Sequence, residues 1–188
     1  MAKYVFNEAY ERPFIHPIIG PNGLCVTREV LTLGDHPHHK GHTIGLGEVG
    51  RPHQPGVDFW SLGNLGDPRY GRILQKGFSR IEEGPVFVRI VEENIWRQND
   101  VLEGYEFQTK ATPRESWRVR VQGEGLLYER RILTFWNLPA SSGRVIDVRT
   151  ILAPAVEEVA LNEDVLGRET RKENGPILVR IAEKHEWP

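Results

Sequence analysis

The segment from residue 35 to residue 42 gathers the side chains best suited to chemistry in this chain. It reads Asp35-His36-Pro37-His38-His39-Lys40-Gly41-His42 and holds four of the seven histidines of the protein. The unperturbed pKa of histidine lies near neutrality, so its side chain can both give and take a proton at physiological pH. The density of histidines therefore favours proton transfer or the binding of a polar substrate.

A metal site is an alternative use of the same histidines. His36 and His38 point to the same side of an extended strand, and neutral imidazoles suit ions such as Zn or Fe. With His42 they form a His-x-His-x-x-x-His pattern that resembles the first motif of the cupins, which usually carry Glu at the last position. Pro37 distorts such a strand, and the downstream histidine of cupins has no counterpart here. A third alternative is that the histidines only pack and hydrogen-bond within a loop.

A second compact cluster follows at Gly56-Val57-Asp58-Phe59-Trp60. A carboxylate next to aromatic rings is a common arrangement for holding a sugar, because the ring covers the C–H face and the carboxylate accepts from hydroxyl groups. The alternative is structural: Asp58 caps a turn, and Phe59 and Trp60 anchor the core.

Composition restricts the class of protein that carries these clusters. The chain has 188 residues, with 24 basic and 26 acidic side chains and a formal net charge of −2. That balance argues against nucleic acid as a partner, because an electrostatic nucleic-acid binder shows a basic surplus. The sequence contains no run of about 18 apolar residues, so no transmembrane helix is predicted. Glu8 interrupts the apolar core that a signal peptide needs. We therefore predict a cytoplasmic protein without a membrane partner.

The elements that must position the clusters are predicted to be β-strands. Charged residues alternate with Val, Ile and Leu at a period of two over residues 72–81, 85–96, 116–121, 125–135, 143–152 and 176–182. We predict an all-β antiparallel β-sandwich in a single domain of residues 1–188, with a long functional loop region at 34–71. Asn22-Gly23 predicts a tight turn, and Pro13 and Pro17 predict that residues 12–19 form an edge strand or an irregular strand. The arginines of the later strands, Arg131 among them, are expected on a solvated face.

Several of these motifs, in this order, resemble a bacterial family. The resemblance rests on the motifs Arg12-Pro13-Phe14-Ile15-His16-Pro17, Gly20-Pro21-Asn22-Gly23, Asp35-His36-Pro37-His38-His39, Gly56-Val57-Asp58-Phe59-Trp60 and Lys172-Glu173-Asn174-Gly175-Pro176. The chain is similar to proteins named PmoA-like or "methane oxygenase PmoA", which form a domain of unknown function. The resemblance implies a galactose-mutarotase-like β-sandwich (a supersandwich) and a carbohydrate ligand.

The resemblance also implies that part of the fold is incomplete in this chain. Relatives continue with further strands, whereas this sequence ends at Pro188. We expect either a shortened relative or strands supplied by a second chain. Because an open sheet edge is normally covered or paired, we predict a homo-oligomer or a partner subunit over that edge.

Together these observations predict a carbohydrate-active or carbohydrate-binding protein whose histidine-rich segment and Val57–Trp60 segment form a sugar pocket. If catalytic, it is a sugar lyase, epimerase, mutarotase or hydrolase-like enzyme that uses histidine as acid and base and needs no cofactor. The predicted catalytic residues are His36, His38, His39 and Asp58. The predicted substrate-binding residues are Asp35, Lys40, His42, Trp60, Glu173 and Arg180, the last two on the segment that matches the family's later motif. One alternative is a non-catalytic carbohydrate-binding or accessory subunit of a larger complex. Another is a metal-dependent, cupin-like enzyme that holds a divalent ion such as Zn or Fe on His36, His38 and His42.

Overall fold

Two antiparallel four-stranded sheets form the body of the protein. The computed structural model describes residues 2–7, 9–28, 39–61, 66–103, 119–161 and 177–179. The first sheet has the order β1-β2-β3-β12, with β1 at Ala2–Val5, β2 at Phe14–Ile18, β3 at His42–Ile44 and β12 at Ile177–Val179. The second sheet has the order β10-β9-β6-β5, with β5 at Gly71–Glu83, β6 at Phe87–Gln98, β9 at Gly125–Trp136 and β10 at Ile146–Pro154.

Shorter elements complete the described part of the chain. β4 (Val49–Gly50) pairs with β11 (Ala160–Leu161), and β7 (Val101–Glu103) pairs with β8 (Val119–Val121). A 3₁₀ turn, η1 (Ala140–Ser142), lies between β9 and β10, and the described residues contain no α-helix. Within these residues, no helix has the length and apolar character that crossing a membrane requires.

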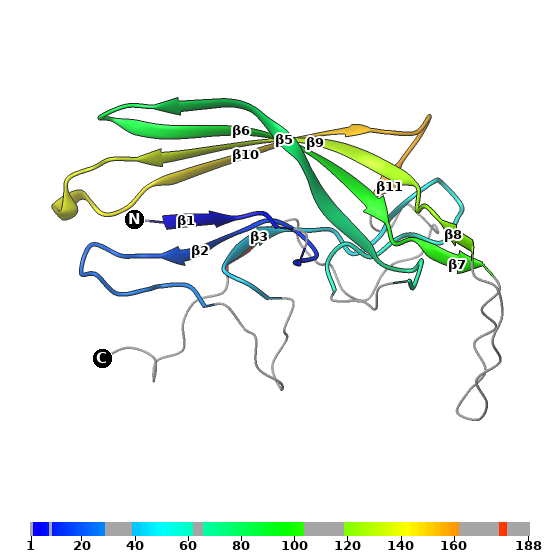
Figure 1. The fold of residues 1–188 in the computed structure, drawn as a ribbon. Helices are drawn as coiled ribbons and strands as arrows, with labels where there is room; N and C mark the ends of the chain where they lie inside the picture. The colour runs from blue at the N-terminus through cyan, green and yellow to red at the C-terminus, as the bar shows by residue number, and fades with distance from the viewer. Residues whose placement is uncertain are drawn as a thin grey trace.

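The two sheets face one another as the layers of a sandwich. In Figure 1, β1, β2 and β3 lie on one side and the long strands β5, β6, β9 and β10 on the other. Side chains join the layers: the Tyr4 hydroxyl on β1 donates to Glu92 on β6, and the Phe6 ring meets the Phe78 ring of β5 edge-on at 5.0 Å. The predicted all-β antiparallel sandwich is confirmed.

Alternation along β6 and β9 explains which side chains enter the sandwich. The strands pair in an antiparallel register that places inward residues opposite one another, as Ile90 with Leu133, Glu92 with Arg131, Asn94 with Glu129 and Trp96 with Leu127. Intervening residues point to the outer face, where Glu93 and Arg130 form an ion pair of 2.8 Å between Oε1 and Nε.

An apolar cluster fills one end of the interior. It combines the start of β5 and the end of β6 with residues of the 44–59 region and of β9, namely Ile44, Leu46, Val49, Val57, Phe59, Ile73, Trp96, Leu126 and Leu127. Phe59 and Trp96 pack with their ring centroids 5.2 Å apart. The predicted functional loop region thus also contributes part of the core.

Of the two predictions for residues 12–19, the edge strand is wrong, because β2 lies between β1 and β3, whereas the irregular strand agrees with a register shift between β1 and β2. β3 pairs only with Phe14 and Ile15, ahead of Pro17. On the other side of β2, His16 and Pro17 together lie opposite the single residue Lys3, which is a β-bulge. The missing N–H of Pro17 therefore falls where the ladder is interrupted, and an interior strand can accommodate the proline.

The predicted turn at Asn22-Gly23 is confirmed. Gly23 adopts a φ of 83°, its N–H donates to the carbonyl of Gly20 at 3.1 Å, and Gly20 N–H donates to the Leu24 carbonyl at 2.8 Å. The turn returns the chain so that Ile19 and Cys25 form an antiparallel bridge.

Candidate functional site

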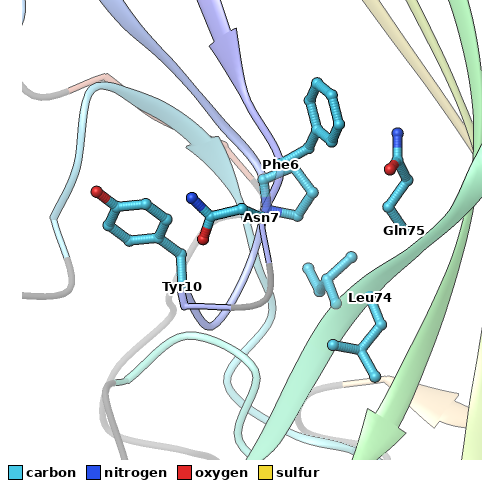
Figure 2. A pocket seen from close by; sticks show the side chains of 7 residues that line it. Phe6, Asn7, Tyr10, Leu74 and Gln75 are labelled. Atoms are coloured by element: carbon cyan, nitrogen blue, oxygen red, sulfur yellow. The ribbon is translucent and has the colours of Figure 1, made fainter.

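A cavity of about 280 Å³ lies between the segment that follows β1 and the start of β5. Figure 2 shows Phe6, Asn7 and Tyr10 on one side and Leu74 and Gln75 of β5 on the other. The described residues that line it are Phe6, Asn7, Tyr10, Pro13, Ile73, Leu74 and Gln75. The segment is fixed against β5 by two bonds: Ile73 N–H donates to the Glu11 carbonyl at 2.9 Å, and the Arg72 guanidinium donates to the Tyr10 carbonyl at 2.7 Å.

The lining of this cavity combines aromatic rings with carboxamides. Phe6 and Tyr10 supply rings, while Asn7 and Gln75 supply amide groups that both donate and accept. The Nε2 atom of Gln75 is buried and finds no hydrogen-bond partner among the described residues. The wall therefore offers a ligand both ring surfaces and amide groups.

Lys40 lies beside the wall of this cavity. Its Nζ is 2.7 Å from Glu11 Oε1 and 5.7 Å from the centroid of the Tyr10 ring, and both members of the ion pair are largely buried. Gly41, the next residue, has a φ of 45°, and a Cβ there would lie 2.2 Å from the carbonyl oxygen of Ile15. Only glycine fits this position, so the chain can pass close to β2 between Lys40 and His42.

His39 and Trp60 bring the two predicted segments together. Their ring centroids are 5.8 Å apart in an edge-on arrangement, and the Arg12 guanidinium carbon lies 6.0 Å from the Trp60 ring. Arg12 also donates to the Phe59 carbonyl at 2.9 Å and to Thr43 Oγ1 at 3.2 Å. Trp60 is buried, and its ring packs against His39 and Arg12. These contacts support the structural alternative for Trp60. Its predicted contact with a sugar stays a prediction.

Asp58 makes the contacts of a turn residue. Its Oδ1 accepts from the backbone N–H of Trp60 at 2.7 Å and from that of Ser61 at 2.9 Å. The backbone of Asp58 is also bound, since its N–H donates to the Arg69 carbonyl and its carbonyl accepts from Gly71 N–H. These bonds support the structural alternative for Asp58, and its predicted catalytic role stays a prediction.

His42 belongs to β3 and is half-buried, opposite Ile15 of β2 and Val179 of β12. Burial lowers the pKa of His42, because the imidazolium loses its hydration, and the nearby charge of Arg131 adds a smaller effect in the same direction. The side chain is therefore neutral at physiological pH.

The remaining predicted site residues lie outside the described residues: Asp35, His36, His38, Glu173 and Arg180. Within the part of the chain that the structure describes, no group of three or more His, Cys, Asp or Glu side chains is placed to hold a metal ion.

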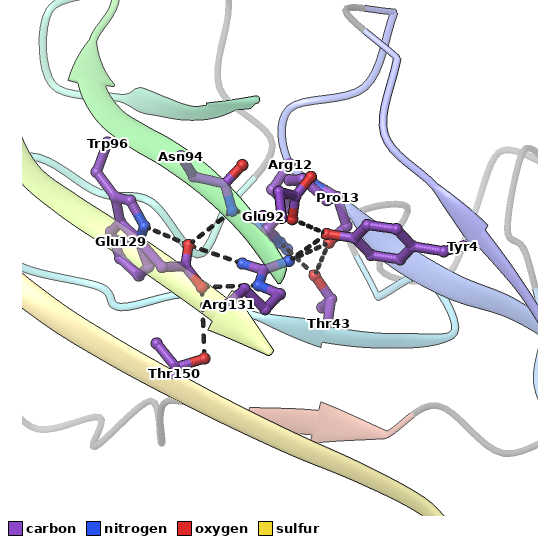
Figure 3. A network of polar contacts seen from close by, with 10 residues as sticks. All are labelled: Tyr4, Arg12, Pro13, Thr43, Glu92, Asn94, Trp96, Glu129, Arg131 and Thr150. Atoms are coloured by element: carbon purple, nitrogen blue, oxygen red, sulfur yellow. Dashed lines mark hydrogen bonds and ion pairs between the residues drawn. The ribbon is translucent and has the colours of Figure 1, made fainter. Parts of the chain in front are cut away.

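A buried polar network occupies the middle of the sandwich, next to the cavity. Figure 3 shows Arg131 at its centre, bound through Nε and Nη2 to the two carboxylate oxygens of Glu129 at 2.7 and 2.9 Å. Glu129 also accepts from Trp96 Nε1 at 2.8 Å, and Arg131 Nη1 lies 3.1 Å from the Tyr4 hydroxyl oxygen. Burial alone would lower the pKa of Arg131, but the charge of Glu129 raises it overall.

Glu92 is the second carboxylate of this network and is fully buried. One oxygen, Oε2, accepts from the Tyr4 hydroxyl and from Asn94 Nδ2, the latter at 3.1 Å. The other, Oε1, has no hydrogen-bond partner among the described residues, and the same holds for Asn94 Oδ1. Burial raises the pKa of Glu92, and the hydrogen bond from Tyr4 partly opposes this. Asn94 lies directly opposite Gln75 on β5, so the network is one strand away from the cavity.

The expectation that Arg131 lies on a solvated face is wrong, because this side chain is buried. The alternation of inward and outward residues along β9 could have predicted that Arg131 is buried. Arg131 and Glu129 lie at the same alternate positions of β9 as Leu127 and Leu133, which face inward. Glu92 likewise shares its parity with Ile90 and Trp96 on β6.

Comparison with known proteins identifies a family whose function is unknown. A family model described as "Family of unknown function (DUF6807)" matches residues 1–187. No curated protein and no solved structure matches.

Proposed function

We propose that this chain, which belongs to the DUF6807 family of unknown function, binds a carbohydrate in the cavity between the Phe6–Tyr10 segment and β5. The observation that carries the proposal is the composition of the cavity wall, in which the carboxamides of Asn7 and Gln75 lie beside the rings of Phe6 and Tyr10.

The composition of the wall supports a sugar more than a purely apolar ligand. Phe6 and Tyr10 offer ring surfaces to C–H groups, while Asn7 and Gln75 offer amide groups to hydroxyls. A volume of about 280 Å³ is close to the lower end of small-molecule pockets, about 300 Å³, which suits a monosaccharide-sized ligand.

The position of the histidine-rich segment favours a second candidate, a carbohydrate-processing enzyme. Lys40 contacts the Tyr10 ring of the cavity wall, and His39 precedes Lys40 directly. In this form of the proposal the histidines of the segment transfer protons to or from a sugar that the cavity holds.

Saturation-transfer NMR with a panel of neutral hexoses and pentoses tests the proposal. We expect at least one sugar to bind, and Gln75→Leu to weaken it about threefold to tenfold, the effect of losing one hydrogen bond. The matched control is Gln54→Leu, which alters an exposed glutamine outside the cavity and should leave binding unchanged.

Stability separates a binding role of Gln75 from a structural one. Since Nε2 has no partner among the described residues, Gln75→Leu should keep or raise the thermal midpoint while it weakens binding. Absence of binding across the panel, or equal binding by Gln75→Leu, would overturn the proposal. New sugar resonances with the wild type that His39→Ala does not produce would favour the enzymatic form.

A further inference from the structure

The strand β10 lies at one edge of the second sheet and pairs there in a fully regular way. Its register with β9 runs from residue 146 to residue 154 without a shift. Among the described strands, none pairs with the other side of β10. An edge strand presents a row of N–H and C=O groups that a further strand can bind, so β10 is a potential site of strand addition.

Two hydrogen bonds at the ends of this ladder show which backbone groups of β10 face the edge. Trp136 N–H donates to the Val145 carbonyl at 3.1 Å, and Ala155 N–H donates to the Leu126 carbonyl at 2.9 Å. Both bonds continue the register of β10 with β9, so the odd-numbered residues form the hydrogen-bonded pairs. The even-numbered residues direct their N–H and C=O groups away from β9. They are Ile146, Val148, Thr150 and Leu152.

The opposite edge of the same sheet, β5, is protected against pairing. Its register with β6 shifts twice, between Gln75 and Gly77 and between Phe78 and Arg80. Bulges interrupt the regular ladder and twist an edge strand, which is one way in which proteins prevent edge-to-edge association. Of these two edges, β10 is therefore the one suited to a partner strand.

The outward side chains of β10 form a series that is complementary to itself. The even-numbered side chains point inward, since Thr150 donates to the buried Glu129 at 3.4 Å and Val148 packs on the apolar cluster. The odd-numbered side chains are exposed on the outer face. From residue 145 to residue 151 they are apolar, acidic, basic and apolar, namely Val145, Asp147, Arg149 and Ile151. Read in the opposite direction, each acid meets a base and each apolar residue meets another.

We infer that the edge of β10 binds β10 of a second copy of this chain, in an antiparallel pair whose two-fold axis passes through Val148. In this register Asp147 of each copy lies opposite Arg149 of the other, and Val145 lies opposite Ile151. Opposite charges and apolar side chains at directly opposite positions stabilise a sheet. Even-numbered residues also lie opposite even-numbered residues, as the outward backbone groups require. The second sheets of the two copies then form one continuous sheet.

The charges on β10 select this register over its neighbours. Moving the axis by one residue keeps the backbone bonds, but it places Asp147 opposite Asp147, or Arg149 opposite Arg149, and like charges at opposite positions destabilise a sheet. Both side chains are available for the pairing. Asp147 accepts from Trp136 Nε1 through Oδ2, at 2.8 Å, which leaves Oδ1 for a guanidinium group. Arg149 forms no ion pair with any residue that the structure describes.

Sedimentation velocity of the full chain over a series of protein concentrations tests the interface. We expect a dimer that dissociates on dilution. Asp147→Arg should weaken it at least about tenfold, because it places two like charges opposite one another at two symmetric positions, and Arg149→Asp should do the same. Circular dichroism checks that the variants fold. The matched control is Glu83→Arg, the same change of charge at an exposed acid of β5, which should leave the dimer unchanged.

Exchanging the charges distinguishes this interface from any other. The double variant Asp147→Arg/Arg149→Asp restores opposite charges and should form a dimer as the wild type does. An equimolar mixture of the two single variants should form a heterodimer, because two basic positions of one chain then face two acidic positions of the other. A wild type that stays monomeric at every concentration would overturn the inference. An oligomer that neither single variant weakens would overturn it too, and so would single variants that neither the double variant nor mixing restores.

Discussion

The interior of the sandwich has two parts built on the same strands. At one end, side chains such as Phe59, Ile73 and Leu127 form an apolar cluster. A few residues away on β6 and β9, the inward positions carry Glu92, Glu129 and Arg131. Trp96 belongs to both parts, because it packs against Phe59 and donates its Nε1 hydrogen to Glu129.

The difference shows two ways of occupying a buried position. Each apolar group contributes in proportion to the area it removes from water, so its loss is local. A buried charge instead loses its hydration, and only its partners make the position tolerable, so removing one partner affects the whole network. Substitutions in the apolar cluster should therefore act independently of one another, whereas the network should respond as a unit.

The largest effect is expected for Arg131→Met. This variant leaves Glu129 without its bidentate partner in the interior, and the free energy of unfolding should fall by about 3–5 kcal/mol. Urea denaturation measures it. The control is Arg130→Met on the outer face, where an exposed ion pair with Glu93 contributes at most about 1 kcal/mol. Equal losses in the two variants would contradict the distinction between network and surface.

A smaller effect is expected for Leu127→Ala at the apolar end. Removing a buried leucine side chain costs about 2–5 kcal/mol, depending on how far the cavity collapses, and no charge is stranded. Ile151→Ala, at an exposed position of β10, is the matched substitution and should cost less than about 1 kcal/mol. If Leu127→Ala destabilised the protein more than Arg131→Met, the ranking of the two regions would be reversed.

The smallest expected effect is a dependence of protein stability on pH. It should arise from the network, which contains the titratable Glu92, and not from the apolar cluster. The raised pKa of Glu92 means that the folded protein holds this proton more tightly than the unfolded chain. The associated stability is fully present below the ordinary value of 4.5 and is lost as the pH rises through the folded pKa. The wild type should thus lose stability relative to Glu92→Gln as the pH is raised from 4 toward neutrality, as urea denaturation at each pH would show.

Tyr4→Phe provides the matched variant for this titration. The Tyr4 hydrogen bond lowers the pKa of Glu92, so its removal should move the loss of stability to higher pH. If the difference in stability between wild type and Glu92→Gln stayed constant across this pH range, Glu92 would have the same pKa in the folded and unfolded states, which would contradict the prediction.

The fold could be predicted from sequence because outward charges alternate with inward aliphatic residues along most of each long strand. The predicted ranges 72–81, 85–96, 125–135 and 143–152 fall on β5, β6, β9 and β10 with small shifts at the ends. The pattern fails in the middle of β6 and β9, where Glu92 and Arg131 occupy inward positions. Hydropathy identifies an inward face only where that face is apolar, so it wrongly predicts a solvated position for Arg131.

The candidate site was predictable only in part. The histidine-rich segment and the Asp58 segment were expected to lie side by side, and His39 indeed lies against Trp60. The cavity itself joins Tyr10 to Gln75, which come from different elements and have no shared local motif. Neither a ring nor a carboxamide is distinctive in sequence, so a site of this composition emerges only from the tertiary arrangement.

The bond between Arg131 and Tyr4 also bears on the order of folding, because it spans 127 residues of chain. Closing a loop of that length costs about 4 kcal/mol in chain entropy, from (3/2)RT ln n, whereas one hydrogen bond contributes about 1 kcal/mol. The contact therefore cannot bring β1 to β9 on its own. We expect the Tyr4 contacts, which join β1 to Glu92 and Arg131, to form only once the two sheets have docked, whereas the bonds within β6 and β9 can form as those strands pair.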